Sequence, residues 1–380
     1  MAEQVISPDL GFVKDVIKSG GESLKKCFQC ATCSAVCNVT PDNRPFPRKE
    51  MIHAQWGLKD RLFSNPDIWL CHQCSDCTAY CPRGAKPGEV LGAVRKLSIQ
   101  HYSVPRFLGM AVGRPQYLVL LFAIPVVILL ILLSSLGHLD PSAIPKGEDG
   151  GISYAEFMPA IYIEIIYGAV SAFAAFVFVF GIYRYWKDMV RAGGESRWKM
   201  ILKGALLYTI ISTVVEILLH KRFRKCEVTK ARANSHLLVF YGFIGLAITA
   251  LWGFWYLYGL EWESPYPLTD PMKWLGNLSA LALITGITLV VINRNKNKEK
   301  AGIGSYFDWL FIVVIYAIVV TGILSEVLRL ANIAALAYLI YFTHLVFVFF
   351  LFAYAPFSKM AHMVYRATAM VFAKQSEREV

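Results

Sequence analysis

Six apolar stretches, each long enough to cross a lipid bilayer, dominate residues 115–360 of this 380-residue chain. A helix needs about 20 apolar residues to cross the hydrocarbon core, where every backbone polar group must be bonded within the structure. We expect crossings at residues 117–136, 157–183, 236–257, 274–291, 307–326 and 334–357. The sequence therefore predicts a bundle of membrane helices to which the polar residues 1–110 are attached.

Charge is distributed unevenly around these stretches, and it predicts their orientation. The chain carries a net charge of +11, yet its Lys and Arg residues gather at the ends of apolar segments, which excludes a nucleic-acid-binding surface. Basic connections at 184–197, 221–232, 294–300 and after 359 alternate with acidic ones at 140–156 and 261–270. We therefore expect a multi-pass protein of the cell inner (plasma) membrane with both termini in the cytoplasm.

A seventh apolar stretch, residues 201–219, has positive charge on both sides and contains Glu216. If it crossed the membrane, the basic segment that follows would lie outside and the topology would invert. We therefore expect a helix lying on the cytoplasmic interface. The predicted fold is all-α, with a small helical domain, a six-helix transmembrane bundle and one interfacial helix.

Eight of the nine cysteines form two identical runs near the N-terminus. Both runs read C-x2-C-x2-C-x3-C, and they consist of Cys27, Cys30, Cys33 and Cys37, and of Cys71, Cys74, Cys77 and Cys81. Three closely spaced thiolates bind three irons of one cubane, and the fourth cysteine serves the other cluster. We expect two [4Fe–4S] clusters, held by Cys27, Cys30, Cys33 and Cys81 and by Cys71, Cys74, Cys77 and Cys37.

Two structural zinc sites are the alternative interpretation of these cysteines, but such sites are typically built from two separated pairs of ligands.

Residues 1–26 lack the apolar core of a signal peptide, so we expect this domain in the reducing cytoplasm. Helices expected at 48–56, 60–63 and 85–100 make it a helical ferredoxin-like domain. Cys226, between basic residues, is expected to be an ordinary cysteine.

The predicted domains are residues 1–105, the iron–sulfur domain; 106–156, the first crossing and its outer loop; 157–365, the histidine-bearing bundle; and 366–380, a cytoplasmic tail.

Burying a histidine ring in or near the membrane costs free energy unless the ring has a partner, so such histidines are candidates for ligands. His236 begins the third crossing and His362 follows the last, so both lie at the cytoplasmic face and are expected to hold a haem b between them. His344 is 18 residues before His362, which on a continuous helix is five turns, or about 27 Å, along one face. That separation suits two haems, one near each surface.

The role of His344 stays open, because Leu246 occupies the position from which a second axial histidine would be expected. His138 is the candidate partner for an outer haem, and His344 could otherwise be a quinone ligand or a packed polar residue. Glu164, Glu326 and Arg329 lie in the outer half as well. Oxidation of a quinol releases two protons, so Glu164 and His344 are candidates for a quinone and proton site.

The chain resembles known families in both halves. Residues 1–100 resemble the C subunit of heterodisulfide reductase, through the two cysteine runs and the segment PRKEM at 47–51. Residues 160–365 are similar to the gamma subunit of respiratory nitrate reductase, above all from His344 to His362 with PFSK at 356–359 between. In that family the two histidines ligate different haems, and a histidine at the His236 position completes the inner one.

The order of the two parts is similar to the C-subunit family of quinone-interacting membrane-bound oxidoreductases. This resemblance implies menaquinone as the substrate, flavin- and iron–sulfur-containing heterodisulfide reductase A-like partners, and adenylylsulfate reductase as the eventual acceptor in sulfate respiration. We expect an oxidoreductase subunit that passes electrons between quinol, haem b and two clusters. The alternatives are a component of a related heterodisulfide reductase or sulfite-reduction-linked complex, and a haem-free anchor for an iron–sulfur protein.

Overall fold

The structure, a computed structural model, describes residues 7–147, 150–193, 206–220, 225, 230–298 and 304–376. Every regular element within these ranges is an α-helix or a 3₁₀-helix, which confirms the all-α expectation. The N-terminal domain contains α1 (Leu10–Lys18), α2 (Thr32–Ala35), α3 (Arg48–Gln55), α4 (Lys59–Phe63), α5 (Asp67–Leu70), α6 (Asp76–Ala79) and α7 (Pro87–Tyr102). Helix α8 (Arg106–Val112) leads from it to the bundle.

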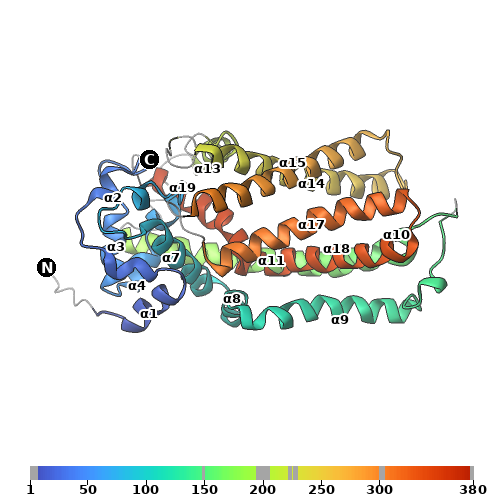
Figure 1. The fold of residues 1–380 in the computed structure, drawn as a ribbon, viewed down its shortest axis with the longest axis horizontal. Helices are drawn as coiled ribbons and strands as arrows, with labels where there is room; N and C mark the ends of the chain where they lie inside the picture. The colour runs from blue at the N-terminus through green and yellow to red at the C-terminus, as the bar shows by residue number, and fades with distance from the viewer. Residues whose placement is uncertain are drawn as a thin grey trace.

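Six helices are long and apolar enough to cross a membrane, as expected. They are α9 (Leu118–Leu136), α11 (Ala160–Gly193), α14 (Lys230–Gly259), α15 (Pro271–Lys296), α17 (Tyr306–Leu330) and α18 (Ala334–Tyr354). They run side by side, and the N-terminal domain covers one end of the bundle (Figure 1). We call this the cysteine end, and the opposite end, where α9, α14 and α17 finish, the far end.

Small residues let α14 and α15 approach closely, as is common where lipid gives no hydrophobic drive to association. A Cβ atom on Gly245 would lie 2.0 Å from Oγ and 2.9 Å from Cβ of Ser279, so a larger residue there would push the two helices apart. A Cβ atom on Gly286 would lie 2.7 Å from the backbone nitrogen of Val239. This contact fixes α14, and with it His236, against the rest of the bundle.

The N-terminal domain shares a core with the bundle. A continuous cluster of buried side chains runs from Phe12 on α1 to Phe349 on α18. At the junction the rings of Trp69 and Tyr365 stack with centroids 5.2 Å apart. The hydroxyl of buried Tyr102 donates to Asp188 on α11 at 3.1 Å. These contacts hold the cysteine domain at a fixed position on the bundle.

Within the described residues, the seventh apolar stretch contains α13 (Leu206–Leu218), whose 13 residues span about 20 Å, less than a 30 Å hydrocarbon core. It lies at the cysteine end (Figure 1) and packs on α19 (His362–Gln375). Lys374 pairs with Glu216 at 2.9 Å. Residues 201–205 of the expected helix lie outside the described residues. Helix α19 extends to Gln375 and buries Ala369 and Phe372.

One expectation is wrong. His344 and His362 do not share a continuous helix, because α18 ends at Tyr354 and two 3₁₀ turns, Ala355–Phe357 and Lys359–Ala361, precede α19. Pro356 has no N–H to continue the helix, and the Ser358 side chain instead accepts from the Met360 amide at 3.2 Å. His362 is therefore the first residue of a new helix.

Candidate functional site

The two cysteine runs fold into loops of the same shape. In each loop the second and fourth residues after the first cysteine have positive φ: Gln29 and Ala31 in one, Gln73 and Ser75 in the other. Residues other than glycine seldom take this conformation. It gives both loops the same turn before the short helices α2 and α6, which pack against one another. The repeated sequence motif is thus a repeated backbone motif.

The cysteines fall into two groups in space. A small cavity is lined by one group, which consists of Cys27, Cys30, Cys33 and Cys81. In the other group, Cys37 lies within electrostatic range of Cys71 and Cys74, and Cys77 lies near all three. The last cysteine of each run therefore sits with the first three of the other run. None of the eight forms a disulfide bond within the described part of the chain.

The environment of these thiols fits iron–sulfur ligation. Burial raises the pKa of Cys33 to about 11 and that of Cys37 to about 12, so a bound metal must supply the charge that favours the thiolate. The loops also donate hydrogen bonds to sulfur: the backbone amide of Gln73 donates to Sγ of Cys71 at 3.3 Å. No three His, Cys, Asp or Glu side chains of the described residues converge as a single metal ion requires. In a cubane, by contrast, each thiolate binds its own iron.

The two groups differ in exposure. The first loop is at the surface, where Cys30 is exposed and its neighbour Phe28 is 66 % exposed beneath the guanidinium of Arg83. The second loop faces the bundle, and its His72 is buried. One group is therefore close to solvent and the other close to the membrane helices.

His236 and His362 both lie at the cysteine end, within electrostatic range of each other. Nδ1 of His362 is 2.6 Å from the carbonyl oxygen of Lys359, and a carbonyl only accepts, so this nitrogen carries the hydrogen. Burial lowers the pKa of His362 to about 4, and the ring is neutral at pH 7 with its lone pair on Nε2. Nδ1 of His236 contacts Nε2 of His220 at 3.1 Å. Both rings are thus held through Nδ1, as metal-ligating histidines are.

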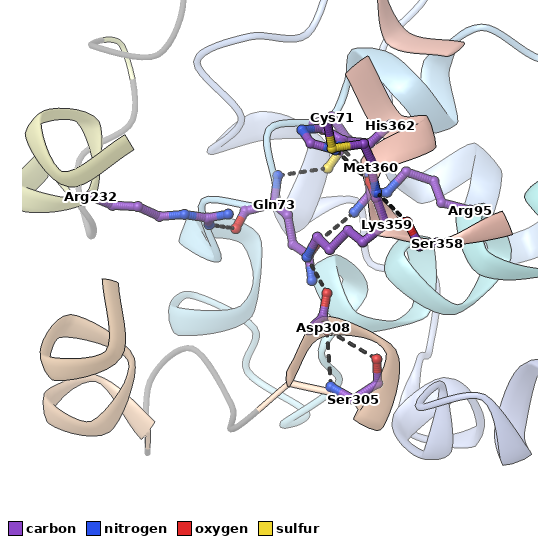
Figure 2. A network of polar contacts seen from close by, with 10 residues as sticks. All are labelled: Cys71, Gln73, Arg95, Arg232, Ser305, Asp308, Ser358, Lys359, Met360 and His362. Atoms are coloured by element: carbon purple, nitrogen blue, oxygen red, sulfur yellow. Dashed lines mark hydrogen bonds and ion pairs between the residues drawn. The ribbon is translucent and has the colours of Figure 1, made fainter. Parts of the chain in front are cut away.

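Arginines join these histidines to the second cysteine loop. Arg232, one turn before His236, donates to the carbonyl oxygen of Gln73 (Figure 2). Arg366, one turn after His362, contacts the ring of His72. Arg95 on α7 donates to Oε1 of Gln73 at 2.7 Å and to the carbonyl of Ile68 at 2.9 Å. One arginine from α14 and one from α19, the helices that carry His236 and His362, therefore contact the loop that begins at Cys71.

The far end holds a cavity of about 320 Å³, at the lower end of the range for small-molecule sites. Its lining comprises Ile152, Ser153, Tyr154, Thr249, Ser264, Pro265, Tyr266, Met272, Lys273, Gly322, Ser325, Glu326, Arg329, Tyr341 and His344. Lys273 pairs with Glu326 at 2.6 Å. Nδ1 of His344 donates to the carbonyl of Ile318 at 3.1 Å, which leaves the lone pair on Nε2. The cavity thus combines an imidazole, an ion pair and several hydroxyl groups within apolar walls.

Other expected residues lie apart from this cavity. Glu164 accepts a hydrogen bond from the exposed Tyr258. His138 is 2.9 Å through Nδ1 from the carbonyl of Phe157. Leu246 packs in an apolar cluster with α15 and α17. Cys226 lies outside the described residues. Within the described part of the chain, His344 is the one histidine that lines the cavity.

Sequence reasoning missed the groups that connect the sites, namely Gln73, Arg95, Arg366 and His220. One signal was available, because Gln29 and Gln73 occupy the same position in the two cysteine runs. The arginines carried no signal, since basic residues at the ends of membrane helices are common. His220 stood among the basic residues that follow an apolar stretch and had no visible partner.

Relatives among curated proteins match the N-terminal domain. A protein of Archaeoglobus profundus, described as similar to the C subunit of heterodisulfide reductase, is 36% identical over 94 residues, covering 24% of this chain and 50% of the relative. The C subunit of the H(2):CoB-CoM heterodisulfide,ferredoxin reductase of Methanothermobacter marburgensis is 38% identical over 90 residues, covering 23% of this chain and 47% of the relative. The chain thus spans about half the length of these relatives. No solved structure matches the chain significantly.

Two protein families cover almost the whole of the chain. The 4Fe-4S dicluster domain matches residues 23–85, which contain both cysteine loops. The family described as Citrate utilization protein B (CitB) matches residues 112–380, which contain all six candidate membrane spans and the histidines at both ends of the bundle. Since the second match covers more than half of the chain, the protein belongs to the CitB family and carries a 4Fe-4S dicluster domain before its membrane bundle.

Proposed function

We propose that this protein is the membrane component of a respiratory oxidoreductase. It passes electrons between a quinol in the bilayer, a haem b at the cysteine end, two [4Fe–4S] clusters and a soluble partner. The observation that carries this proposal is the direct contact between the histidine helices and the second cysteine loop. Arg232 and Arg366, each one turn from a histidine, both bond to that loop.

His236 and His362 would hold the haem, with Nε2 of each ring as the ligand atom. Haem b supplies one-electron chemistry, and the protein sets its position and potential. Lys359 orients His362 through its carbonyl oxygen, and the α14–α15 contact fixes His236. The cluster ligands would be Cys27, Cys30, Cys33 and Cys81 in one group and Cys71, Cys74, Cys77 and Cys37 in the other, which the spatial grouping supports.

The far-end cavity would bind the quinone ring, with menaquinone as the expected carrier. The lone pair on Nε2 of His344 could accept a hydroxyl proton, and Glu326 offers a carboxylate in the same cavity. The cavity favours this role of His344 over a second haem with His138, whose ring bonds to a loop carbonyl instead. Glu164 lies apart from the cavity, so its proposed part is limited to passing protons onward.

The exposed first cysteine loop would face the soluble partner. The resemblance to heterodisulfide reductase supports a partner like the flavin- and iron–sulfur-containing component of that enzyme, and adenylylsulfate reductase as a more distant acceptor. The description of the CitB family favours a second candidate, in which the soluble partner takes part in citrate utilization. Co-purification of the tagged protein from its native membranes distinguishes the two, because the partner is then identified directly.

Optical spectroscopy tests the central proposal. Purified protein should show b-type bands in reduced-minus-oxidised spectra, and a menaquinol analogue should generate them. His236→Ala and His362→Ala should abolish those bands, while His53→Gln, on α3 away from both sites, should keep them. Iron–sulfur absorbance without haem bands in the wild-type protein would instead support a haem-free anchor.

A further inference from the structure

We infer that His220 is the positioning residue for His236, holding that ring as a haem ligand through an imidazole–imidazole hydrogen bond. The inference rests on the haem b site proposed above and goes beyond it. His220 lies just after the end of α13, and its Nε2 is 3.1 Å from Nδ1 of His236 on α14. Neither the membrane spans nor the cysteine motifs account for this histidine.

The direction of the hydrogen bond follows from the other end of the His220 ring. Nδ1 of His220 is 3.2 Å from the carbonyl oxygen of Leu218, which only accepts a hydrogen bond. In neutral His220 the hydrogen therefore sits on Nδ1, and Nε2 carries the lone pair. Nδ1 of His236 must then donate to it, which leaves the lone pair of His236 on Nε2. The three groups form a chain that selects the tautomer able to bind iron.

The structure around His220 holds this geometry. His220 is 7 % exposed and has φ of +49°, a conformation uncommon outside glycine. The ring of Phe240 packs against both imidazoles, with centroids 4.9 Å from His220 and 6.4 Å from His236. Tyr241 donates to the carbonyl of Leu218 at 2.8 Å and so ties the end of α13 to α14. The His220 ring is buried, packed against Phe240 and hydrogen-bonded through both nitrogens, so its Nε2 is held in place as an acceptor.

The two proposed haem ligands therefore have different supporting partners. His362 donates to a backbone carbonyl, whereas His236 donates to an imidazole nitrogen. A stronger acceptor on Nδ1 makes the ligand ring more electron-rich, which stabilises the oxidised haem and lowers its reduction potential. His220 would thus adjust the potential of the haem next to the second cysteine loop without touching the iron.

The test compares His220→Ala and His220→Gln with Tyr241→Phe in purified full-length protein. Tyr241→Phe is the matched control, because it loosens the same end of α13 but leaves the His220–His236 bond in place. Haem per protein, the haem midpoint potential and the low-spin electron paramagnetic resonance signal are measured for each. We expect His220→Ala to bind haem with an affinity about 10- to 100-fold lower, to raise the potential and to shift the signal.

His220→Gln offers an amide oxygen as acceptor, so its potential should lie between those of wild type and His220→Ala. If His220→Ala does not accumulate, the glutamine variant and the control decide the question. Unchanged potential and signal in both His220 variants would overturn the inference. So would loss of haem in His220→Ala together with full haem in His236→Ala, which would make His220 the ligand. Wild-type protein without haem would instead overturn the proposed function itself, before any variant is compared.

Discussion

The ion pair between Lys359 and Asp308 gives the sharpest test of how the bundle holds the cysteine end. Asp308 caps the first turn of α17, where it accepts from the amide and the hydroxyl of Ser305, each at 3.0 Å. Lys359 reaches it from the 3₁₀ turn that precedes His362 (Figure 2). The side chains are only 23 % and 11 % exposed, and burial lowers the pKa of Lys359. Lys359→Met therefore leaves the Asp308 carboxylate with little water, and Arg294 remains as a nearby cation.

The expected magnitude follows from that burial. Removing one partner of a buried pair costs about 3–5 kcal/mol, and the partial exposure together with the nearby Arg294 argues for the lower figure, about 3 kcal/mol. At about 2.1 cal/mol/K per residue, 380 residues give an unfolding entropy of about 0.8 kcal/mol/K. The melting temperature of Lys359→Met should thus fall by about 4 °C. The double variant Lys359→Met/Asp308→Asn should recover most of that loss, because it removes both charges of the pair.

Melting curves of detergent-purified protein, for both single variants and the double variant, measure the coupling in a double-mutant cycle. Lys86→Met is the control, because its pair with Glu89 at 3.8 Å is more exposed and should contribute less than about 1 kcal/mol. A coupling within about 0.5 kcal/mol of zero for Lys359 and Asp308 would refute the reasoning, since the pair would then behave as a solvated one.

Three further predictions follow from the same structure. Gly322→Ala would place a methyl group 3.1 Å from Cε1 of His344, so the KM for a quinol analogue should rise about tenfold at unchanged haem content; an unchanged KM would argue against a quinone at His344. Tyr102→Phe removes the bond to Asp188 and should lower the unfolding free energy by about 2 kcal/mol, seen as a melting temperature about 2–3 °C lower. Burial lowers the pKa of His101 to about 4, below its unfolded value near 6.5. Between these two pH values the unfolded state therefore binds more protons than the folded state. Stability should therefore fall as pH drops from 6.5 towards 4, by about 1–2 kcal/mol after allowance for partial exposure, and His101→Phe should flatten that slope.

The membrane bundle was predictable because its signal is local. An apolar run of about 20 residues has few alternatives to a crossing helix, and all six expected runs are helices of spanning length. The helices of the cysteine domain were found for similar reasons, at α3, α4 and α7. The break between His344 and His362 was misjudged, because Pro356 permits either a kink or a stop, and packing of the residues beyond it decided.

The candidate sites also differ in whether a local sequence pattern marks them. Eight cysteines at fixed spacing specify their own chemistry, so their role could be proposed without a structure. The pairing of His236 with His362 could likewise be proposed from the sequence, because both are expected at the same end of the bundle. The far-end cavity could not be anticipated, since it joins Tyr154 with Lys273 and Glu326 on separate helices. Side chains that meet from helices far apart in the sequence leave no local pattern in the chain.

The sequence by itself determined the class of the protein: apolar runs demand a membrane bundle, and paired cysteine runs demand metal. The tertiary structure decided how the two parts connect. It turned the second cysteine loop towards the histidines and placed Arg232 and Arg366 against it. It also brought Nε2 of His220 within hydrogen-bond distance of Nδ1 of His236. The reason is physical. Burial of apolar surface and metal ligation depend on residue type and spacing, whereas the partners of a buried polar group depend on which helices pack together.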